Sequence, residues 1–559
     1  MGNQFTNCNH KDFLKNPNSS SIYLNDTTPT EILNLIYELD GNKNGPSSIP
    51  TNILKLIAPM SSVILSKIIN NTYETGIYPE CLKSSNVTPV FKKDSKLVVT
   101  NYRPISLLSN INKIFEKTLY TRLYSFFELS KVINQNQFGF RKNHSTVHAL
   151  MKLTDQIYKA LDNHQYACGV FLDLQKAFDT VEHSILLEKL SHYGIRGVVN
   201  NLINSYLTDH SQSVSIKGAR SRIKKVIHGV PQGSVLGPLL FLIYINDMQH
   251  AIRHSTMFHF ADDTSILHCN KSLKRINQEI NHDLKLINIW LRTNKICLNT
   301  TKTEIILFRS KFWDEPTKQT DKNKPKELQR PKHLNFRISG QRIHPVTSVK
   351  YLGVILDQHL SWEKHVNQLL PKLSRANGLL AKVRHSVNTE TLLNVYYGLF
   401  HSHLTYASMI WGQNPTESIN KLCILQNKAL RIISFKGPRE TADPLYNSLK
   451  ILKFEDVMNL QNCMFTTKLL IGKLPKALNN LFKFVNHQAY DTRALFKLEV
   501  QRPIGATYGT NSITNRIIKC WNEVIPNINL PRENCSVIQV KKSVRKYLET
   551  KYDILLNTS

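Results

Sequence analysis

Hydrophobic positions recur along the chain with two different periods. A period of three to four residues over 30–39 predicts an amphipathic helix, and a second helical stretch is expected over 54–73 after a Gly-Pro-Ser-Ser break at 45–48. From about 87 to 357, short apolar runs alternate with amphipathic stretches. This alternation predicts a domain of mixed strands and helices.

Within the mixed region, an apolar run over 168–174 suits a central strand, and two further runs, 257–260 and 264–268, flank Ala261-Asp262-Asp263. That arrangement predicts a hairpin with the aspartates at its tip. Three more elements are expected: a buried helix over 236–248, an amphipathic helix over 276–291 and a strand over 305–308.

The pattern divides the chain into five parts. They are a loose segment rich in Asn, Ser and Thr (1–29), a helical extension (30–72), the mixed domain (73–357), a helical connection (358–480) and a C-terminal region of unassigned structure (481–559). Residues 311–332 are polar and Lys-rich, which predicts an exposed insert within the mixed domain. Periodicity fades around 487–511, and no internal repeat is evident.

Charge narrows the range of partners. The 559 residues include 72 Lys and Arg against 41 Asp and Glu, a formal net charge of +31, and 41% are hydrophobic, so the chain can fold around a core. Such an excess favours nucleic acid, with an acidic membrane or a ribosome as alternatives. No apolar run reaches the roughly 20 residues that span a membrane, so no membrane partner is expected. The scattered cysteines predict reduced thiols and no zinc knuckle.

Three aspartates carry the candidate chemistry. Asp173 ends an apolar run, where an ionised carboxylate is costly unless it is paired or bound to metal, and Asp262 and Asp263 are adjacent acids that repel each other. If neighbouring strands bring them together, they could hold two Mg²⁺ ions about 3.5–4 Å apart and catalyse an in-line displacement. An Asp-Asp pair alone is more often a solvated surface turn, so the surrounding sequence has to distinguish a metal site from such a turn.

Those neighbours resemble the motifs of non-LTR retrotransposon reverse transcriptases, of the LINE-like, jockey or CR type. All six occur in the family order, and the match covers roughly residues 30–365 well. In chain order they are Lys92-Lys93-Asp94 with Asn101–Ser106 of the fingers, Val170–Asp179 (motif A), Gly229–Pro238 (motif B), Phe260–Asp263 (motif C), Leu298–Thr303 (motif D) and Tyr351–Val354 (motif E).

The resemblance implies a role for each matched residue. Asp173, Asp262 and Asp263 are implied as the catalytic residues and as ligands of two Mg²⁺ ions, for which Mn²⁺ could substitute. Seven residues are implied to bind the nucleotide: Lys92, Lys93, Arg103, Phe178, Gln232, Gly233 and Lys302. Phe178 would be the gate against a ribose 2′-hydroxyl, with a simple core phenylalanine as the alternative. Which of the two lysines reaches the phosphates stays open. Tyr351, Leu352 and Gly353 are implied to grip the primer.

The implied fold is α+β, a right-hand polymerase with fingers, a palm built on an antiparallel sheet and a helical thumb, followed by a mostly helical C-terminal region. The implied activity is RNA-directed DNA polymerisation, with template RNA, a DNA primer or target and dNTPs as partners. The nucleus, with a cytoplasmic ribonucleoprotein stage, is the implied location.

Two alternatives to this activity stay open, an RNA-directed RNA polymerase and an inactive nucleic-acid-binding relic. Phe178 and the Gly229–Pro238 motif argue against the first alternative. The intact Asp173, Asp262 and Asp263 argue against the second. Only about 30 residues precede the first predicted helix, so the endonuclease of full-length elements is expected to be absent, and no ribonuclease H carboxylate set is recognised.

Overall fold

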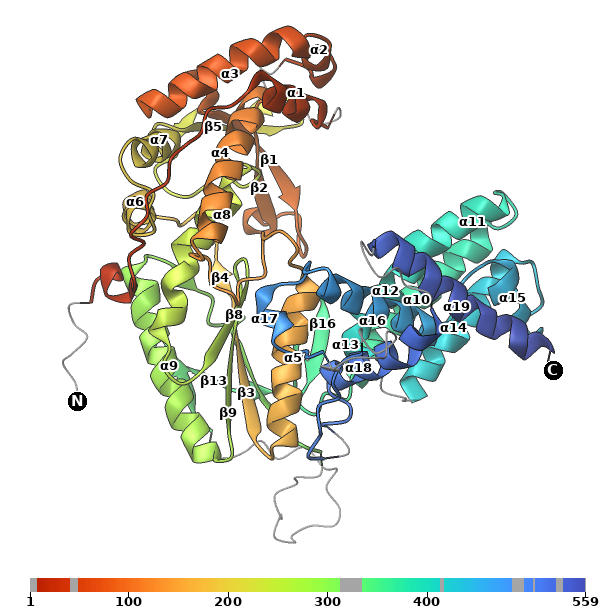
Figure 1. Ribbon diagram of the computed structural model, residues 1–559. Coiled ribbons are helices and arrows are strands. Elements are labelled where there is room, and N and C mark those ends of the chain that lie inside the picture. Colours follow the sequence, from red (N-terminus) through yellow and green to blue (C-terminus); the bar gives the residue numbers. More distant parts are fainter. Residues whose placement is uncertain are drawn as a thin grey trace, which may run out of the picture.

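The structure, a computed structural model, describes residues 8–40, 49–311, 334–412, 417–484, 497–505, 508–528 and 536–557. Helices make up much of the chain, and three regions can be followed in Figure 1: a column of N-terminal helices around a small sheet, a larger sheet below it, and a lobe of C-terminal helices at the side. No helix in the described part of the chain is both long enough and apolar enough to cross a membrane.

The N-terminal column begins with α1 (Pro29–Tyr37), α2 (Thr51–Leu56) and α3 (Ala58–Thr75). The helix expected over 54–73 is therefore two helices. Pro59 causes the break, because proline lacks a backbone N–H and is tolerated in the first turn of a helix rather than inside one. The expected break at 45–48 lies outside the described residues.

The N-terminal segment is expected to be loose over residues 1–29, but its described part, residues 8–28, is anchored. After the short helix η1 (His10–Phe13) it has no regular structure up to α1, yet it is held by side chains from distant elements. Asn18 donates to the carbonyl of Tyr193 at 3.2 Å, and Arg122 donates to the carbonyls of Asn25 and Asp26 at 2.6 and 2.9 Å. These bonds satisfy backbone groups that a strand or helix would otherwise pair.

The column contains a small mixed sheet. Its strands run in the order β2 (Tyr102–Leu107), β1 (Ser84–Phe91), β5 (Ser211–Ile216) and β6 (Ala219–Arg220), with β7 (Lys224–Lys225) also paired to β5. β1 is antiparallel to β2 and parallel to β5. The surrounding helices are α4 (Asn110–Leu129), α6 (His183–His192), α7 (Val198–Leu207) and α8 (Leu236–Ile245), with short turns η2 (Glu80–Leu82), η3 (Val99–Asn101) and η4 (Asn246–Ala251).

The central sheet confirms the predicted strands. Its order is β14 (Pro345–Val346), β11 (Glu304–Phe308), β3 (Tyr166–Leu172), β9 (Asp263–Asn270) and β8 (Thr256–Phe260), antiparallel except for β14. α5 (Thr146–Asp162) and α9 (Leu273–Thr293) pack on it. Alternate side chains of β3 enter two separate hydrophobic clusters, Phe171 the one that includes α5 and Val170 the one that includes α9.

Three two-stranded ribbons border this sheet. They are β4 (Leu174–Gln175) with β10 (Cys297–Leu298), β12 (Phe336–Ile338) with β13 (Gln341–Ile343), and β15 (Ser348–Tyr351) with β16 (Val354–Asp357). Nearly all of the predicted insert at 311–332 lies outside the described residues.

The C-terminal lobe is helical, as the periodicity after residue 361 predicts. Its helices are α10 (Glu363–Val383), α11 (Thr389–Val395), η5 (Tyr396–His401), α12 (Ser402–Thr405), α13 (Ser408–Trp411), α14 (Glu417–Ile433), α15 (Asp443–Ser448), α16 (Phe454–Leu470), α17 (Lys476–Asn479), α18 (Ile513–Val524), η7 (Ile525–Asn527) and α19 (Val537–Asn557).

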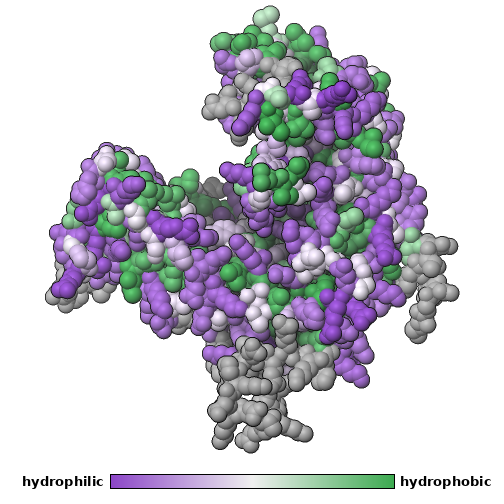
Figure 2. Space-filling model, turned by 180° about the vertical axis from the view of Figure 1, so that it is seen from behind, coloured by the Kyte–Doolittle hydropathy of each residue, from purple (hydrophilic) through white to green (hydrophobic). Residues whose placement is uncertain are grey.

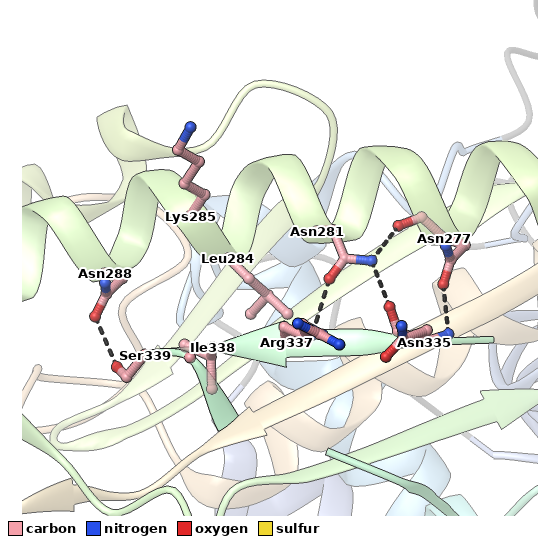
Figure 3. A pocket seen from close by; sticks show the side chains of 10 residues that line it. Asn277, Asn281, Leu284, Lys285, Asn288, Asn335, Arg337, Ile338 and Ser339 are labelled. Carbon is pink, nitrogen blue, oxygen red and sulfur yellow. Dashed lines mark hydrogen bonds between the residues drawn. The ribbon is translucent and has the colours of Figure 1, made fainter. Parts of the chain in front are cut away.

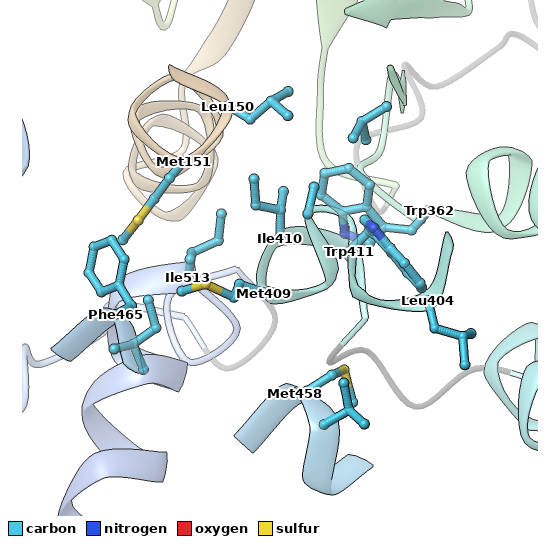
Figure 4. Packing of buried hydrophobic residues seen from close by; sticks show 14 of the residues in the cluster. Leu150, Met151, Trp362, Leu404, Met409, Ile410, Trp411, Met458, Phe465 and Ile513 are labelled. Atoms are coloured by element: carbon cyan, nitrogen blue, oxygen red, sulfur yellow. The ribbon is translucent and has the colours of Figure 1, made fainter. Parts of the chain in front are cut away.

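One continuous core joins this lobe to the central sheet. Met151 of α5 lies near Phe465 and Ile513 of the C-terminal helices in Figure 4, and all three side chains are buried. The indole of Trp362 donates to the hydroxyl of Tyr158 in α5 at 3.1 Å. Seen from behind in Figure 2, a hollow separates the lobe from the N-terminal column.

Candidate active site

The three aspartates meet at one edge of the central sheet. In the register between β3 and β9, Leu172 lies opposite Thr264, so Asp173 leaves β3 beside the start of β9. Phe260 pairs with Asp263 across a two-residue turn formed by Ala261 and Asp262, with Ala261 at a φ of 56°. The structure thus confirms the predicted hairpin with the aspartates at its tip.

Burial, and after it mutual repulsion, raises the pKa values of two carboxylates in this cluster. Withdrawal of the Asp263 carboxylate from bulk water, and then the negative charges of Asp262 and Asp173, raise its pKa to about 6, although part of its side chain is open to solvent. Desolvation also raises the pKa of Asp262, with a smaller contribution from Asp173. Carboxylates in this state gain from a cation placed among them.

Two cations already lie within electrostatic reach of the cluster. Lys92 and Arg103 both lower the pKa values of Asp262 and Asp263, against the larger effect of burial. They come from the ribbon of β1 and β2, where Val90 lies opposite Arg103 and the backbone N–H of Lys92 donates to the Asn101 carbonyl at 2.9 Å. Lys93 is exposed, and its ammonium lies 4.0 Å from Asp94 instead.

Gln137 supports the aspartate turn and was missed by the sequence analysis. This buried side chain accepts the backbone N–H of Ala261 at 3.1 Å and that of Gly139 at 2.8 Å. A Cβ on Gly139 would lie 2.2 Å from the Ala261 nitrogen, so only glycine fits there. The one sequence signal was the glycine between two phenylalanines at 138–140.

The loop over residues 229–235, which precedes α8, closes the site on the side of the small sheet. Gln232 donates from Nε2 to Asp179 at 2.9 Å, and its carbonyl accepts the backbone N–H of Ser106 in β2 at 2.7 Å. Gly233 has a φ of 114°, and a Cβ there would lie 2.7 Å from the Ser106 carbonyl. Asp179 and Gln232 also line a cavity of about 370 Å³ under this loop.

The buried carboxylate of Glu116 holds the N-terminus of α8, the helix that follows this loop. Glu116 of α4 is fully buried, accepts the Tyr206 hydroxyl at 2.9 Å and the Asn112 amide at 3.0 Å, and accepts the Val235 backbone N–H at 2.5 Å. α8 begins at Leu236; its N-cap residue Val235 has no capping side chain, while the Ser234 hydroxyl accepts the Gly237 N–H at 2.9 Å. Glu116 therefore supplies a carboxylate to its N-terminus from another element, where negative charge is favourable.

Phe178 is half-buried between two aromatic rings. It stacks on Phe241 of α8 with ring centroids 4.5 Å apart and meets the exposed Phe140 edge-to-face at 6.2 Å. Since the ring is neither fully enclosed nor fully exposed, the structure permits a contact with a ligand on its open side.

Lys302 lies in a loop joined to the first aspartate. The backbone N–H of Asn299 donates to the Asp173 carbonyl at 2.8 Å, and the N–H of Lys302 donates to the Asn299 carbonyl at 3.2 Å. The Lys302 side chain is exposed. Lys302 is therefore three residues away from Asn299, whose backbone is hydrogen-bonded to Asp173.

The three residues matched to the primer grip have different environments. Tyr351 is buried behind the sheet, with its ring 5.0 Å from that of Phe171. Leu352 and Gly353 form the turn between β15 and β16, both with positive φ, and the Tyr406 hydroxyl donates to the Leu352 carbonyl. Only the turn residues are positioned for contact with a ligand, so Tyr351 would act from behind them.

Carboxylates thus converge at the edge of the central sheet, within electrostatic reach of basic side chains. Residues 90–356 match the family described as "Reverse transcriptase (RNA-dependent DNA polymerase)". This span is therefore a reverse transcriptase domain, and the resemblance to non-LTR retrotransposon enzymes is confirmed by the similar proteins.

Three similar proteins from Drosophila melanogaster illustrate the relationship. The RNA-directed DNA polymerase from mobile element jockey is 28% identical over 468 residues, covering 81% of this chain and 48% of that protein. The probable RNA-directed DNA polymerase from transposon X-element is 28% identical (79% and 48%), and that from transposon BS is 26% identical (82% and 50%). The chain spans about half the length of these curated relatives.

Proposed function

We propose that this chain is an RNA-directed DNA polymerase that adds dNTPs to the 3′-hydroxyl of a DNA primer paired with template RNA. The observation that carries the proposal is the convergence of Asp173, Asp262 and Asp263 at one sheet edge, within electrostatic reach of Lys92 and Arg103. Nucleotidyl transfer needs this combination, because it brings a polyanionic triphosphate to a deprotonated hydroxyl.

The donor set fits divalent magnesium. Hard carboxylate oxygens are the ligands Mg²⁺ prefers. Burial first, and then repulsion among the carboxylates, raise the pKa values of Asp262 and Asp263, and a bound cation would offset both effects. Asp173, Asp262 and Asp263 would hold two Mg²⁺ ions, or Mn²⁺ in their place. When bound, the ions supply activation of the primer hydroxyl and stabilisation of the leaving pyrophosphate.

The protein's own groups orient the reactants. Arg103 and Lys92 would bind the triphosphate, the first as a fork of donors and the second as a point charge, and the exposed Lys302 would neutralise the departing pyrophosphate. Gln232, held by Asp179, and the glycine backbone at Gly233 would receive the incoming nucleotide. Lys93, which lies beside Asp94, takes a lesser part.

In this proposal the parts of the chain correspond to a right hand. The small sheet and its helices are the fingers and the central sheet is the palm, together residues 73–357, with 30–72 as a helical extension. The helices after β16 are the thumb and connection, residues 358–480, and the hollow in Figure 2 would receive the template–primer duplex. The turn at Leu352 and Gly353 would hold the primer end.

Primer extension on poly(rA)·oligo(dT) with Mg²⁺ tests the proposal, comparing dTTP with UTP. The wild type should extend with dTTP, Asp262→Asn should lose at least about 10³-fold in kcat, and Asp209→Asn, at an exposed aspartate outside the site, should behave as the wild type. Extension with UTP as efficient as with dTTP would indicate an RNA polymerase. A folded wild-type protein that binds the duplex without extending it would refute the proposal and favour a binding relic.

A further inference from the structure

A ribbon that lies between motifs D and E, and belongs to neither, pairs two arginines. In the antiparallel hairpin of β12 and β13, Arg337 lies directly opposite Arg342, and both side chains are exposed. Like charges directly opposite each other destabilise a strand pair. No ion pair to either arginine occurs among the described residues. Within the part of the chain that the structure describes, no acidic side chain offsets these two positive charges, so a bound anion would stabilise them.

The hairpin is mounted on α9 through asparagine side chains, as Figure 3 shows. Asn281 accepts the Arg337 backbone N–H at 2.9 Å and donates to the Asn335 carbonyl at 2.8 Å. Asn277 accepts the Asn335 N–H at 2.8 Å, and Asn288 accepts the Ser339 hydroxyl at 2.7 Å. Amides on one helix face thus replace a neighbouring strand, which fixes the arginines on a rigid support.

Between the hairpin and α9 lies an open cavity of about 520 Å³, lined by four asparagines, Ser339 and the basic Lys285 and Arg337 (Figure 3). The Oδ1 atom of Asn335 is buried without a hydrogen-bond partner. A cavity bordered by amides and cations offers hydrogen bonds to a base edge or a ribose hydroxyl and counter-charge to a phosphate.

The charges continue along α9. Lys274, Lys285 and Arg292 are exposed and lie 11 and 7 residues apart, close to whole numbers of helical turns. The two acids of α9 are engaged elsewhere: Glu279 meets His268 at 2.6 Å, and Asp283 accepts the backbone N–H groups of Arg253 and Ser255. Both acids of α9 are therefore engaged with groups that do not belong to this basic line.

This line leads towards the catalytic edge. α9 ends at Thr293, and the following strand β10 pairs Leu298 with Leu174, the residue after Asp173. We propose that the β12–β13 hairpin and the adjoining face of α9 form a binding surface for single-stranded RNA, which holds the template strand outside the active site. The assignment of that strand as template rests on the proposed function, whereas its binding does not.

Direct binding of a single-stranded RNA oligonucleotide to the full chain tests this surface. Arg337→Ala/Arg342→Ala should reduce the slope of log K against log salt by about 1.4, the value for two lost phosphate contacts on a single strand, with a roughly tenfold or greater loss of affinity at 0.1 M salt. Lys541→Ala/Lys542→Ala, which removes the same charge from an exposed stretch of α19, should leave the slope unchanged.

The double arginine variant should also keep the wild-type kcat and KM for dTTP on a template–primer whose overhang is only the one templating adenosine, which shows that its fold is intact. An unchanged slope and affinity would overturn the proposal and leave an acidic protein as the partner of the hairpin. Equal losses in both double variants would overturn it too, because they would reflect net charge alone. Neither outcome depends on polymerisation, so failure here is separable from failure of the proposed activity.

Discussion

The carboxylate of Glu116 accepts the backbone N–H of Val235 at 2.5 Å, so a residue of α4 caps the helix that follows the Gln232 loop. Glu116→Gln keeps the shape but removes the charge at the helix N-terminus. We expect a several-fold higher KM for dNTP, equivalent to about 1 kcal/mol, with kcat nearly unchanged, because the loop binds the nucleotide in the proposed function. Steady-state single-nucleotide incorporation measures both constants.

Glu116→Ala provides the comparison, because it leaves the Tyr206 hydroxyl and the Val235 N–H without their acceptor in a buried site. It should lower the free energy of unfolding by about 2–4 kcal/mol in urea titrations. A Glu116→Gln protein with normal KM and reduced kcat would contradict a positioning role.

Selection of the sugar depends on Phe178 in the proposed function. Its ring is fixed by stacking on Phe241, so Phe178→Val should open space beside the ribose without moving α8. Discrimination between dTTP and UTP, as the ratio of kcat/KM values, should fall by at least about tenfold. Phe435→Ala, at an exposed ring of the C-terminal lobe, is the control and should leave that ratio unchanged. If Phe178→Val still rejects UTP as strongly as the wild type, Phe178 is a core residue and does not select the sugar.

A fully buried ion pair holds the α6–α8 region together. Lys189 donates to Asp247 and to the Tyr244 carbonyl, each at 2.6 Å, and its ammonium lies 5.0 Å from the Trp290 ring. Lys189→Met should destabilise the protein by about 3–5 kcal/mol, because it leaves a buried carboxylate unpaired. In urea titrations, Lys189→Met/Asp247→Leu should lower the free energy of unfolding by less than Lys189→Met alone does. A larger loss in the double variant would show that the pair contributes net stability.

The elements that define the site could be predicted from sequence because they are local. The apolar runs on either side of Ala261-Asp262-Asp263 suffice for the hairpin, and Pro59 could even have marked the boundary between α2 and α3. The support of that hairpin could not be predicted, since Gln137 lies 124 residues from the turn it holds. Likewise, the choice between Lys92 and Lys93 depends on the register of β1 and β2, which periodicity does not determine.

Residues that belong to the same sequence motif can also differ in burial. Tyr351, Leu352 and Gly353 belong to one motif, yet the tyrosine packs on Phe171 inside the core and only the other two form the turn. The motif could not predict this difference, because side chains alternate between the two faces of a strand and a motif does not say which face is covered.

Buried histidines should make the folded protein less stable as the pH falls. His365 is 2% exposed, accepts the Ile355 backbone N–H on Nδ1 at 3.3 Å and contacts the Trp411 ring. Burial, and then the charges of Lys372 and Lys350, lower its pKa to about 4. In the unfolded chain an ordinary histidine takes up a proton near pH 6.5.

Since the folded-state pKa lies below the unfolded value, the stability contributed by neutral His365 is complete above pH 6.5 and is lost as the pH falls towards 4. The loss between pH 7 and pH 5 should be about 2 kcal/mol for this one residue. His365→Gln cannot titrate, so the difference in unfolding free energy between these two pH values should shrink by that amount in urea titrations. The exposed His344→Gln serves as the control and should retain the wild-type difference. If His365→Gln retained it as well, the imidazole would have to be protonated within the fold, and the Ile355 N–H could not then donate to it.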